Sequence, residues 1–192
     1  MKMFSYIICR TAFVGETTAG KTSLVQSLIL GRSHLTDVDD RTQVVNIKEW
    51  PVSETQIIMI FDQGGHPVYE ICNPYFITER STILIAHKLS DPSMTARTKQ
   101  VFRHILHQHP GVSQLHFVLT HIDELDKLSE VQREIFSSNF KATIQKLLTI
   151  EIENIQRLIR SPNCFNIENL NRTLESCNSK MQSIQSILHI QI

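Results

Sequence analysis

The sequence is short of the features that mark membrane-spanning or nucleic-acid-binding proteins. No apolar run approaches the length of about 18 residues that crosses a bilayer as a helix. Lysine plus arginine and aspartate plus glutamate number 19 each, and no run of basic residues is longer than two. The sequence therefore has no cluster of basic residues that could bind the phosphate backbone of a nucleic acid. We predict neither a membrane span nor a nucleic-acid partner.

Cysteine is scarce, and its spacing gives no zinc or disulfide pattern. Cys9, Cys72, Cys164 and Cys177 form no C-x-x-C pair, so we interpret them as reduced thiols that act as small apolar side chains. Residues 1–9 carry a lysine and a short apolar patch, but no small-residue cleavage site follows, so they do not predict a signal peptide. These observations predict a cytoplasmic protein.

Glycine is also scarce, with six residues, and two of them fall in one motif. Gly15–Thr22 reads Gly-Glu-Thr-Thr-Ala-Gly-Lys-Thr, a complete G-x-x-x-x-G-K-[ST] phosphate loop between an apolar run and a helical pattern. A strand-loop-helix unit of this kind aims backbone N–H groups and the positive end of a helix at one phosphate. Lys21 is expected along the β- and γ-phosphates, and Thr22 on Mg²⁺. The residues expected around the phosphates are Gly15, Thr18, Ala19, Gly20, Lys21, Thr22 and Ser23.

The rest of the chain alternates strand patterns with helical ones. Residues 56–61 are nearly all apolar and β-branched, and residues 81–86 and 115–119 are also mostly apolar, which is typical of strands covered on both faces. Residues 42–50 alternate like a strand near a sheet edge. Residues 93–109 show helical spacing. This order predicts an α/β fold of the P-loop NTPase type, with a mostly parallel central sheet, helices on both faces, and a ligand crevice at the carboxyl ends of the strands.

The last third of the chain is predicted to be mainly helical, within one domain that covers residues 1–192. Residues 130–160 form a long helical segment, which is either one helix or two with a bend, and 169–189 form a C-terminal helix. Residues 163–167 can supply a last strand. The long segment exceeds what a minimal nucleotide domain needs, so it is either an interaction surface or a helix packed on the sheet.

Two further motifs stand at predicted strand ends. Asp62-Gln63-Gly64-Gly65-His66 follows the most apolar strand, where an acid can hold a water of the Mg²⁺ shell and Gly65 lets its N–H approach a γ-phosphate. Thr120-His121-Ile122-Asp123 follows another strand, and its aspartate can accept the N1–H and 2-amino groups of guanine, which adenine lacks. The plain alternatives are a hairpin turn for the first motif and a helix cap for the second.

Together these motifs resemble the Roc type of Ras-like small GTPase, the Ras-of-complex-proteins domain of large multidomain proteins such as leucine-rich-repeat kinases. The resemblance covers nearly the whole chain. It rests on Gly15–Thr22, Arg41-Thr42 with Trp50, Asp62–Tyr69, Phe76–Ser81 with Leu89–Asp91, and Thr120–Asp123, where Thr-His-x-Asp stands in place of the Asn-Lys-x-Asp of most small GTPases.

The resemblance implies roles for single residues. Thr42 would reach Mg²⁺ and the γ-phosphate, so Thr22, Thr42 and Asp62 are the expected metal residues. His66 stands where relatives keep the residue that orients the attacking water, and it forms the expected catalytic set with Lys21 and Thr42. Because many relatives have Gln at that position, and because Thr17 replaces a common glycine, we predict slow turnover. The expected contacts to guanine are Thr120, His121 and Asp123. The Ser-Ala-Lys motif of the family has no match, and residues 166–169 are its nearest counterpart by position.

The sequence leaves three functions open. The first is a signalling or regulatory switch that binds GTP or GDP with Mg²⁺, hydrolyses GTP slowly, and meets protein effectors or regulators through loops 32–42 and 62–80. The second is a catalytically weak, nucleotide-bound scaffold, and the third is an ATPase in which Asp123 is only a cap. Roc domains are normally followed by a COR dimerisation region, so a homodimer is expected if the chain is part of a larger Roc–COR protein.

Overall fold

The computed structural model describes residues 7–37, 41–66, 73–89, 96–112, 114–121, 123, 127–161 and 166–182. Strands and helices alternate along most of this part of the chain, as the sequence predicts. In chain order the elements are β1 (Ile7–Gly15), α1 (Lys21–Leu30), β2 (Val45–Ser53), β3 (Gln56–Gln63), α2 (Asn73–Phe76), β4 (Ser81–Lys88), α3 (Ala96–Gln108), β5 (Gln114–Thr120), α4 (Glu130–Ile159) and α5 (Ile167–Gln182).

The strands of the described residues form one mixed sheet in the order β2-β3-β1-β4-β5. β1 pairs in parallel with β3 and β4, β4 pairs in parallel with β5, and the edge strand β2 is antiparallel to β3. The α/β class is thus as predicted. The register sets Phe13 of β1 beside Asp62 of β3, so the end of the phosphate-loop strand and the aspartate of the Asp-Gln-Gly-Gly segment are neighbours.

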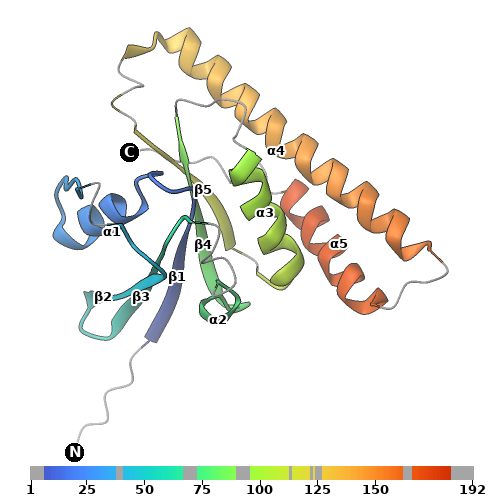
Figure 1. The fold of residues 1–192 in the computed structure, drawn as a ribbon, viewed down its shortest axis with the longest axis horizontal. Coiled ribbons are helices and arrows are strands. Elements are labelled where there is room, and N and C mark those ends of the chain that lie inside the picture. The colour runs from blue at the N-terminus through green and yellow to red at the C-terminus, as the bar shows by residue number, and fades with distance from the viewer. Residues whose placement is uncertain are drawn as a thin grey trace, which may run out of the picture.

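Alternation along β1 divides the apolar core into two layers. Ala12 and Val14 belong to the larger cluster, which α3, α4 and α5 complete, whereas Phe13 belongs to a smaller cluster with Val25 of α1 and Ile60 of β3. Successive side chains of a strand point to opposite faces, so this division places helices on both faces of the sheet. Figure 1 shows α1 on one side of the strands and α3, α4 and α5 on the other.

The long helical segment is one continuous helix, α4, of 30 residues. It begins with a capping box, in which Gln132 N donates to Ser129 Oγ at 3.3 Å and Ser129 N donates to Gln132 Oε1 at 2.8 Å. Phe140 and Ile144 on its inner side are fully buried. Farther along, the buried Glu151 forms an ion pair with Arg103 of α3 and accepts a hydrogen bond from His107 of the same helix.

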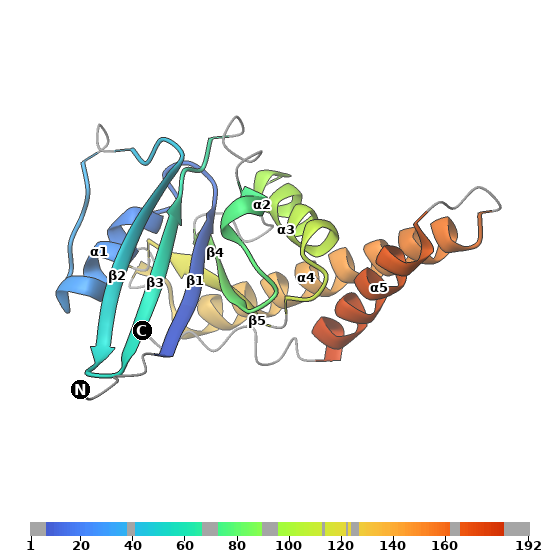
Figure 2. The ribbon, with the colours of Figure 1, turned by 90° about the horizontal axis from the view of Figure 1, so that it is seen from below.

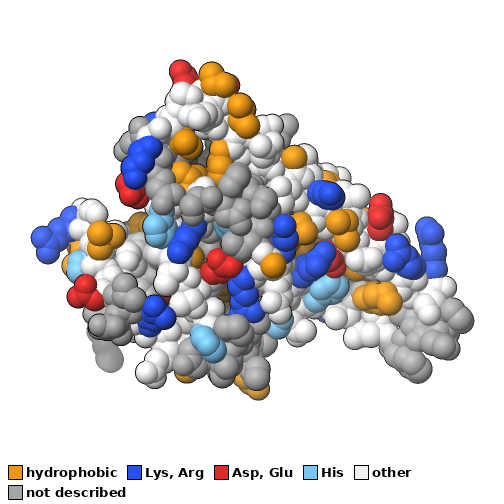
Figure 3. All heavy atoms as spheres, turned by 45° about the horizontal axis from the view of Figure 1, so that its top comes forward, with side chains coloured by type: hydrophobic (Ala, Val, Ile, Leu, Met, Phe, Trp, Pro, Cys, Tyr) orange, Lys and Arg blue, Asp and Glu red, His pale blue; other side chains and the backbone are white. Residues whose placement is uncertain are grey.

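Beyond the sheet, α4 and α5 pack against each other as a helical pair, which extends away from the strands in Figure 2. Part of the surface of α4 is apolar, because Val131, Ile135 and Leu158 are more than half exposed. Figure 3 shows apolar side chains on the surface where α4 begins. None of the helices in the described part of the chain is long and apolar enough to span a membrane.

Several sequence predictions about element boundaries are wrong. The last strand expected at 163–167 does not include Ile167, which begins α5, and residues 163–165 lie outside the described part. Asn166 caps this helix through its side chain, which accepts from Asn169 N at 3.3 Å, so α5 begins two residues before the predicted position 169. Its predicted end at 189 lies outside the described residues. Likewise β2 continues through Pro51, because an edge strand tolerates a residue without an N–H.

Candidate nucleotide-binding site

The loop between β1 and α1 has the backbone conformation of a phosphate cradle. Gly15, Thr18 and Gly20 have positive φ angles of 135°, 63° and 74°. A Cβ atom on Gly15 would lie 2.4 Å from the carbonyl oxygen of Ala86 in β4, so only glycine fits there. The loop thus turns tightly at the carboxyl end of β1, and the N-terminus of α1 follows immediately.

Lys21 lies folded over this loop with 6% of its surface exposed. Its Nζ donates to the backbone oxygens of Gly15 at 3.0 Å and Glu16 at 2.6 Å. Burial lowers the pKa of Lys21 to about 8, an effect that the carboxylates of Asp62 and Glu16 oppose and the charge of Arg97 assists. The ammonium group is therefore poorly solvated, and an anion in the loop would stabilise its charged form.

The lowered pKa of Lys21 predicts that nucleotide affinity depends on pH. A bound phosphate favours the ammonium form, so above a pH of about 8 binding requires proton uptake, and we expect affinity to fall by up to about tenfold per pH unit. Below that pH the lysine is charged in both the free and the nucleotide-bound protein, so it does not make the affinity depend on pH. Titration of a fluorescent GDP analogue between about pH 7 and about pH 9 measures the effect. Lys21→Arg is the control, because arginine stays charged and leaves only the titration of the nucleotide itself.

Three oxygen-bearing side chains meet beside Lys21. Thr22 Oγ1 lies 3.0 Å from Thr42 Oγ1, and Thr42 Oγ1 donates to Asp62 Oδ2 at 3.1 Å. Asp62 is fully buried, and its Oδ1 has no hydrogen-bond partner among the described residues. Burial raises the pKa of its carboxyl group, while hydrogen bonds from Thr22 and Thr42 and the charge of Lys21 oppose the shift. A buried carboxylate with a free oxygen beside two hydroxyls suits a hard cation such as Mg²⁺.

Protein carboxylates alone would not hold that cation. Within the described residues no group of three or more His, Cys, Asp or Glu side chains could bind a metal. Mg²⁺ typically uses one or two protein ligands and completes its shell with waters and substrate phosphates. The cluster of Thr22, Thr42 and Asp62 therefore fits a metal that arrives together with a nucleotide.

The segment after β5 reaches the same site from the other side. Thr120 Oγ1 donates to the backbone oxygen of His87 at 3.2 Å, which fixes the end of β5 against β4. A Cβ on Gly20 would contact the Thr120 side chain at 3.5 Å and His121 at 3.7 Å, so this segment packs directly on the phosphate loop. His121 has a positive φ of 59° and turns into the cavity. Asp123 is exposed, and Ile122 lies outside the described residues.

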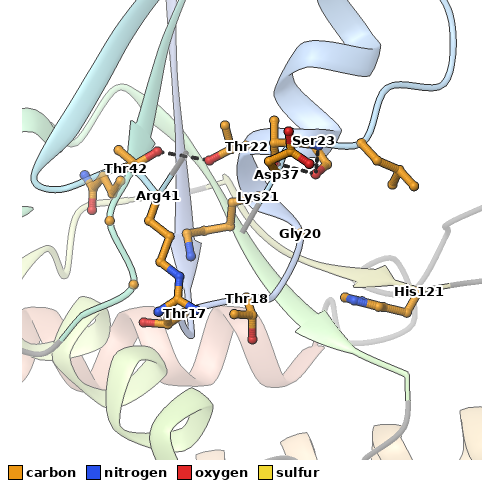
Figure 4. Close-up of a pocket in the computed structure, with 15 residues that line it drawn as sticks. Thr17, Thr18, Gly20, Lys21, Thr22, Ser23, Asp37, Arg41, Thr42 and His121 are labelled. Atoms are coloured by element: carbon orange, nitrogen blue, oxygen red, sulfur yellow. Dashed lines mark hydrogen bonds between the residues drawn. The ribbon is translucent and has the colours of Figure 1, made fainter. Parts of the chain in front are cut away.

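These segments enclose a cavity of about 300 Å³, shown in Figure 4. Gly65 closes one wall, because a Cβ on it would lie 2.3 Å from the backbone N of Thr17. Residues 35–37 and 41–42 line another wall. Ser23 contacts the first of these segments through Thr36, with 2.9 Å between the two hydroxyl oxygens. The cavity lies at the carboxyl ends of β1 and β3, where an α/β sheet normally binds its ligand.

The structure brings most, but not all, of the predicted site residues together. Thr18, Gly20, Lys21, Thr22, Ser23, Thr42, Gly65 and His121 line the cavity. His66 is exposed and is not among these described lining residues, and Pro67, Val68 and Tyr69 lie outside the described part. Residues 166–169, the nearest counterpart by position of the unmatched Ser-Ala-Lys motif, lie at the start of α5, at the end of the helical pair remote from α1 (Figure 1).

Sequence reasoning missed three contributors to the site. Lys88 ends β4, and its Nζ donates to Thr18 Oγ1 at 2.8 Å. Gln63 lines the cavity and is 1% exposed, and among the described residues its side-chain amide has no hydrogen-bond partner. Arg41 also lines the cavity, although the sequence marked it only as a neighbour of Thr42. The sequence held a signal for each of them: Lys88 and Gln63 end strands, and Arg41 directly precedes Thr42.

Comparison with protein families agrees with this geometry. A family model described as "Ras of Complex, Roc, domain of DAPkinase" matches residues 10–123, which is more than half of the chain. The matched segment runs from β1 to Asp123, so it contains the phosphate loop, the Asp-Gln-Gly-Gly segment and the whole Thr-His-x-Asp segment.

Proposed function

The chain belongs to the Roc family of Ras-like GTPase domains, and from this premise we propose that it is a GTP-binding switch that hydrolyses GTP to GDP slowly with Mg²⁺. The observation that carries the proposal is the common cavity of Lys21, Thr42, Gly65 and His121. These residues come from four segments far apart in sequence, and each supplies a group that a guanine nucleotide with Mg²⁺ needs.

The phosphate end of the site is proposed to work through charge and fixed dipoles. Lys21 and the backbone of Gly15, Thr18, Ala19 and Gly20 would hold the β- and γ-phosphates, with Ser23 at the adjoining helix start. Thr22, Thr42 and Asp62 would hold Mg²⁺ directly or through water, and the metal would neutralise charge on the phosphates. Gly65 would give its N–H to the γ-phosphate.

The base end is proposed to select guanine. Thr120 and His121 pack on the phosphate loop, so the residues that follow start beside the bound nucleotide. Asp123 would accept the N1–H and 2-amino protons of guanine, and adenine would leave this carboxylate unpaired. This feature favours a GTPase over an ATPase.

Slow hydrolysis is the proposed consequence of two substitutions. His66 follows Gly65 and would help to place the attacking water, a task for which many relatives use Gln. Thr17 brings a side chain to the cavity wall where a glycine is common, so its volume would crowd the incoming water. The proposed catalytic set remains His66, Lys21 and Thr42.

The setting of this activity is also proposed. Residues 1–192 would form a single Roc-like domain in the cytoplasm, acting as the regulatory G domain of a larger signalling protein. The γ-phosphate would hold loops 32–42 and 62–80 for effectors or regulators, and hydrolysis would release them. As part of a larger Roc–COR protein it would form a homodimer.

A change of base specificity tests this proposal. Purified protein with Mg²⁺ is expected to bind labelled GTP in competition with GTP but not ATP, and to release phosphate. Asp123→Asn is expected to lose GTP and gain xanthosine triphosphate, because asparagine can donate to the 2-oxo group of xanthine while accepting from its N1–H. Glu153→Gln on α4 removes an exposed carboxylate outside the site and serves as the matched control.

Each failure has a distinct meaning. Protein that retains no guanine nucleotide contradicts the proposed function as a whole. Competition by ATP equal to that by GTP supports the ATPase instead, and an Asp123→Asn protein with unchanged preference removes Asp123 from the base site. GTP that stays intact over hours in the purified protein favours the scaffold.

A further inference from the structure

Arg41 stands in the loop that covers the phosphate site, directly before the anchored Thr42. The hydroxyl of Thr42 contacts Thr22 at 3.0 Å and Asp62 at 3.1 Å, so this end of the loop is fastened to the phosphate-loop helix and to β3. Arg41 lines the same cavity as Thr17, Lys21 and Gly65. In Figure 4 its side chain extends past Lys21 toward Thr17, with the guanidinium directed at the phosphate loop.

Other arginines are placed less well for chemistry. Arg97 of α3 lines a separate small cavity beneath the loop, with Gly15, Gln63 and Val101, and donates to Gln100. Arg80 is exposed just before β4. Among the described arginines, Arg41 alone lines the nucleotide cavity.

The chemistry of phosphoryl transfer gives such an arginine a task. Water adds to the γ-phosphorus, the bond from that phosphorus to the β–γ bridging oxygen breaks, and its electron pair stays on GDP. The water leaves as part of inorganic phosphate with the release of its proton. Negative charge moves toward the bridging oxygen and the β-phosphate in the transition state, and a planar guanidinium can contact a bridging and a γ-oxygen together.

We propose that Arg41 is a catalytic residue supplied by the chain's own switch loop, which stabilises the transition state of GTP hydrolysis without a partner protein. This inference rests on the proposed GTPase function. Lys21 holds phosphate charge in the ground state, whereas Arg41 neutralises the charge that develops as the bond breaks. Arg41 thereby offsets part of the reduction in hydrolysis rate that we attribute to His66 and Thr17.

The contribution of Arg41 to hydrolysis depends on the contacts that hold Thr42 in place. Arg41 is one residue from Thr42, so its guanidinium reaches the phosphates only while Thr42 remains fastened near Thr22 and Asp62. Release of Thr42 after hydrolysis would withdraw the arginine together with the loop. Catalysis and the closed state of the switch would therefore share one segment.

The test uses fluoroaluminate, which mimics the transferring phosphoryl group beside GDP and Mg²⁺. Wild-type protein with GDP, Mg²⁺ and fluoroaluminate is expected to form the complex without any added protein, seen by ¹⁹F NMR. Arg41→Ala is expected to form none, to hydrolyse GTP at least about 100-fold more slowly in single turnover, and to keep its GDP affinity within about threefold. Arg41→Lys keeps the charge without the planar fork and is expected to resemble Arg41→Ala.

Arg157→Ala provides the matched control, because Arg157 is exposed on α4, outside the proposed switch loops, and is not among the cavity-lining residues. Its fluoroaluminate complex and turnover are expected to equal those of wild type. An Arg41→Ala protein that still forms the complex and turns over normally overturns the inference. A parallel loss of GDP affinity and turnover also overturns it, because Arg41 would then act in binding. Absence of guanine-nucleotide binding in wild type refutes the underlying function itself, a result distinct from these two.

Discussion

Lys21→Ala is expected to weaken GDP and GTP binding by about 100- to 1,000-fold, which corresponds to about 3–4 kcal/mol. Lys21 is 6% exposed and is the only described lysine that lines the cavity. Phosphate oxygens would replace or join its present acceptors, the carbonyl oxygens of Gly15 and Glu16. Charge-assisted hydrogen bonds in a buried site are stronger than those at the surface.

Titration with a fluorescent GDP analogue measures this effect. Lys146→Ala, on an exposed position of α4, serves as the control and is expected to bind like wild type. Removal of Lys21 also frees two loop carbonyls, so urea unfolding must show that the variant is folded before its affinity is interpreted. An affinity within about threefold of wild type would remove Lys21 from the phosphate site, because even one lost charge-assisted hydrogen bond exceeds that change.

Phe140→Ala is expected to have the largest effect on stability, lowering the free energy of unfolding by about 3–5 kcal/mol. Phe140 is fully buried where α4 covers the sheet. Its ring lies 5.3 Å from His87, 5.6 Å from Phe117 and 6.0 Å from Phe136, measured between ring centroids. Alanine would leave a cavity between three rings that belong to three different elements, so no single rotamer change can fill it.

Urea unfolding followed by circular dichroism measures the loss, and a melting temperature lower by about 6–20 °C is expected for a domain of this size. Val131→Ala is the control, because the Val131 side chain is 64% exposed on the same helix and its truncation is expected to cost less than about 0.5 kcal/mol. Equal losses of unfolding free energy in the two variants would contradict the prediction, because they would show that Phe140 stabilises the protein no more than an exposed residue of α4 does.

The same variant connects the core with the base end of the site. Phe140 packs on His87, and the carbonyl oxygen of His87 accepts the hydrogen bond from Thr120 Oγ1. Thr120 in turn contacts Gly20 of the phosphate loop. The packing of α4 therefore supports the segment that we propose reads guanine.

Much of the fold was predictable because its signals are local. A phosphate loop needs glycine where φ is positive, and the side chains of β1 alternate between two cores, so Gly15, Gly20 and the β-branched runs carry their own geometry. The end of the chain lacked such signals. Residues 163–167 contain three apolar side chains and two asparagines, a pattern that fits a strand or the start of a helix equally well. The side chain of Asn166 caps the helix that begins at Ile167.

The sequence by itself determined the class of the fold, the place of the phosphate loop and the order of the motifs, since each depends on spacing within a few residues. The tertiary structure alone decided which side chains meet. Thr42 reaches Asp62 across 20 positions, Gly65 closes on Thr17, and His121 packs on Gly20. The position of Arg41 over the cavity likewise follows from the attachment of its neighbour. Contacts between distant segments depend on how strands and loops pack in three dimensions, and no local pattern encodes that packing.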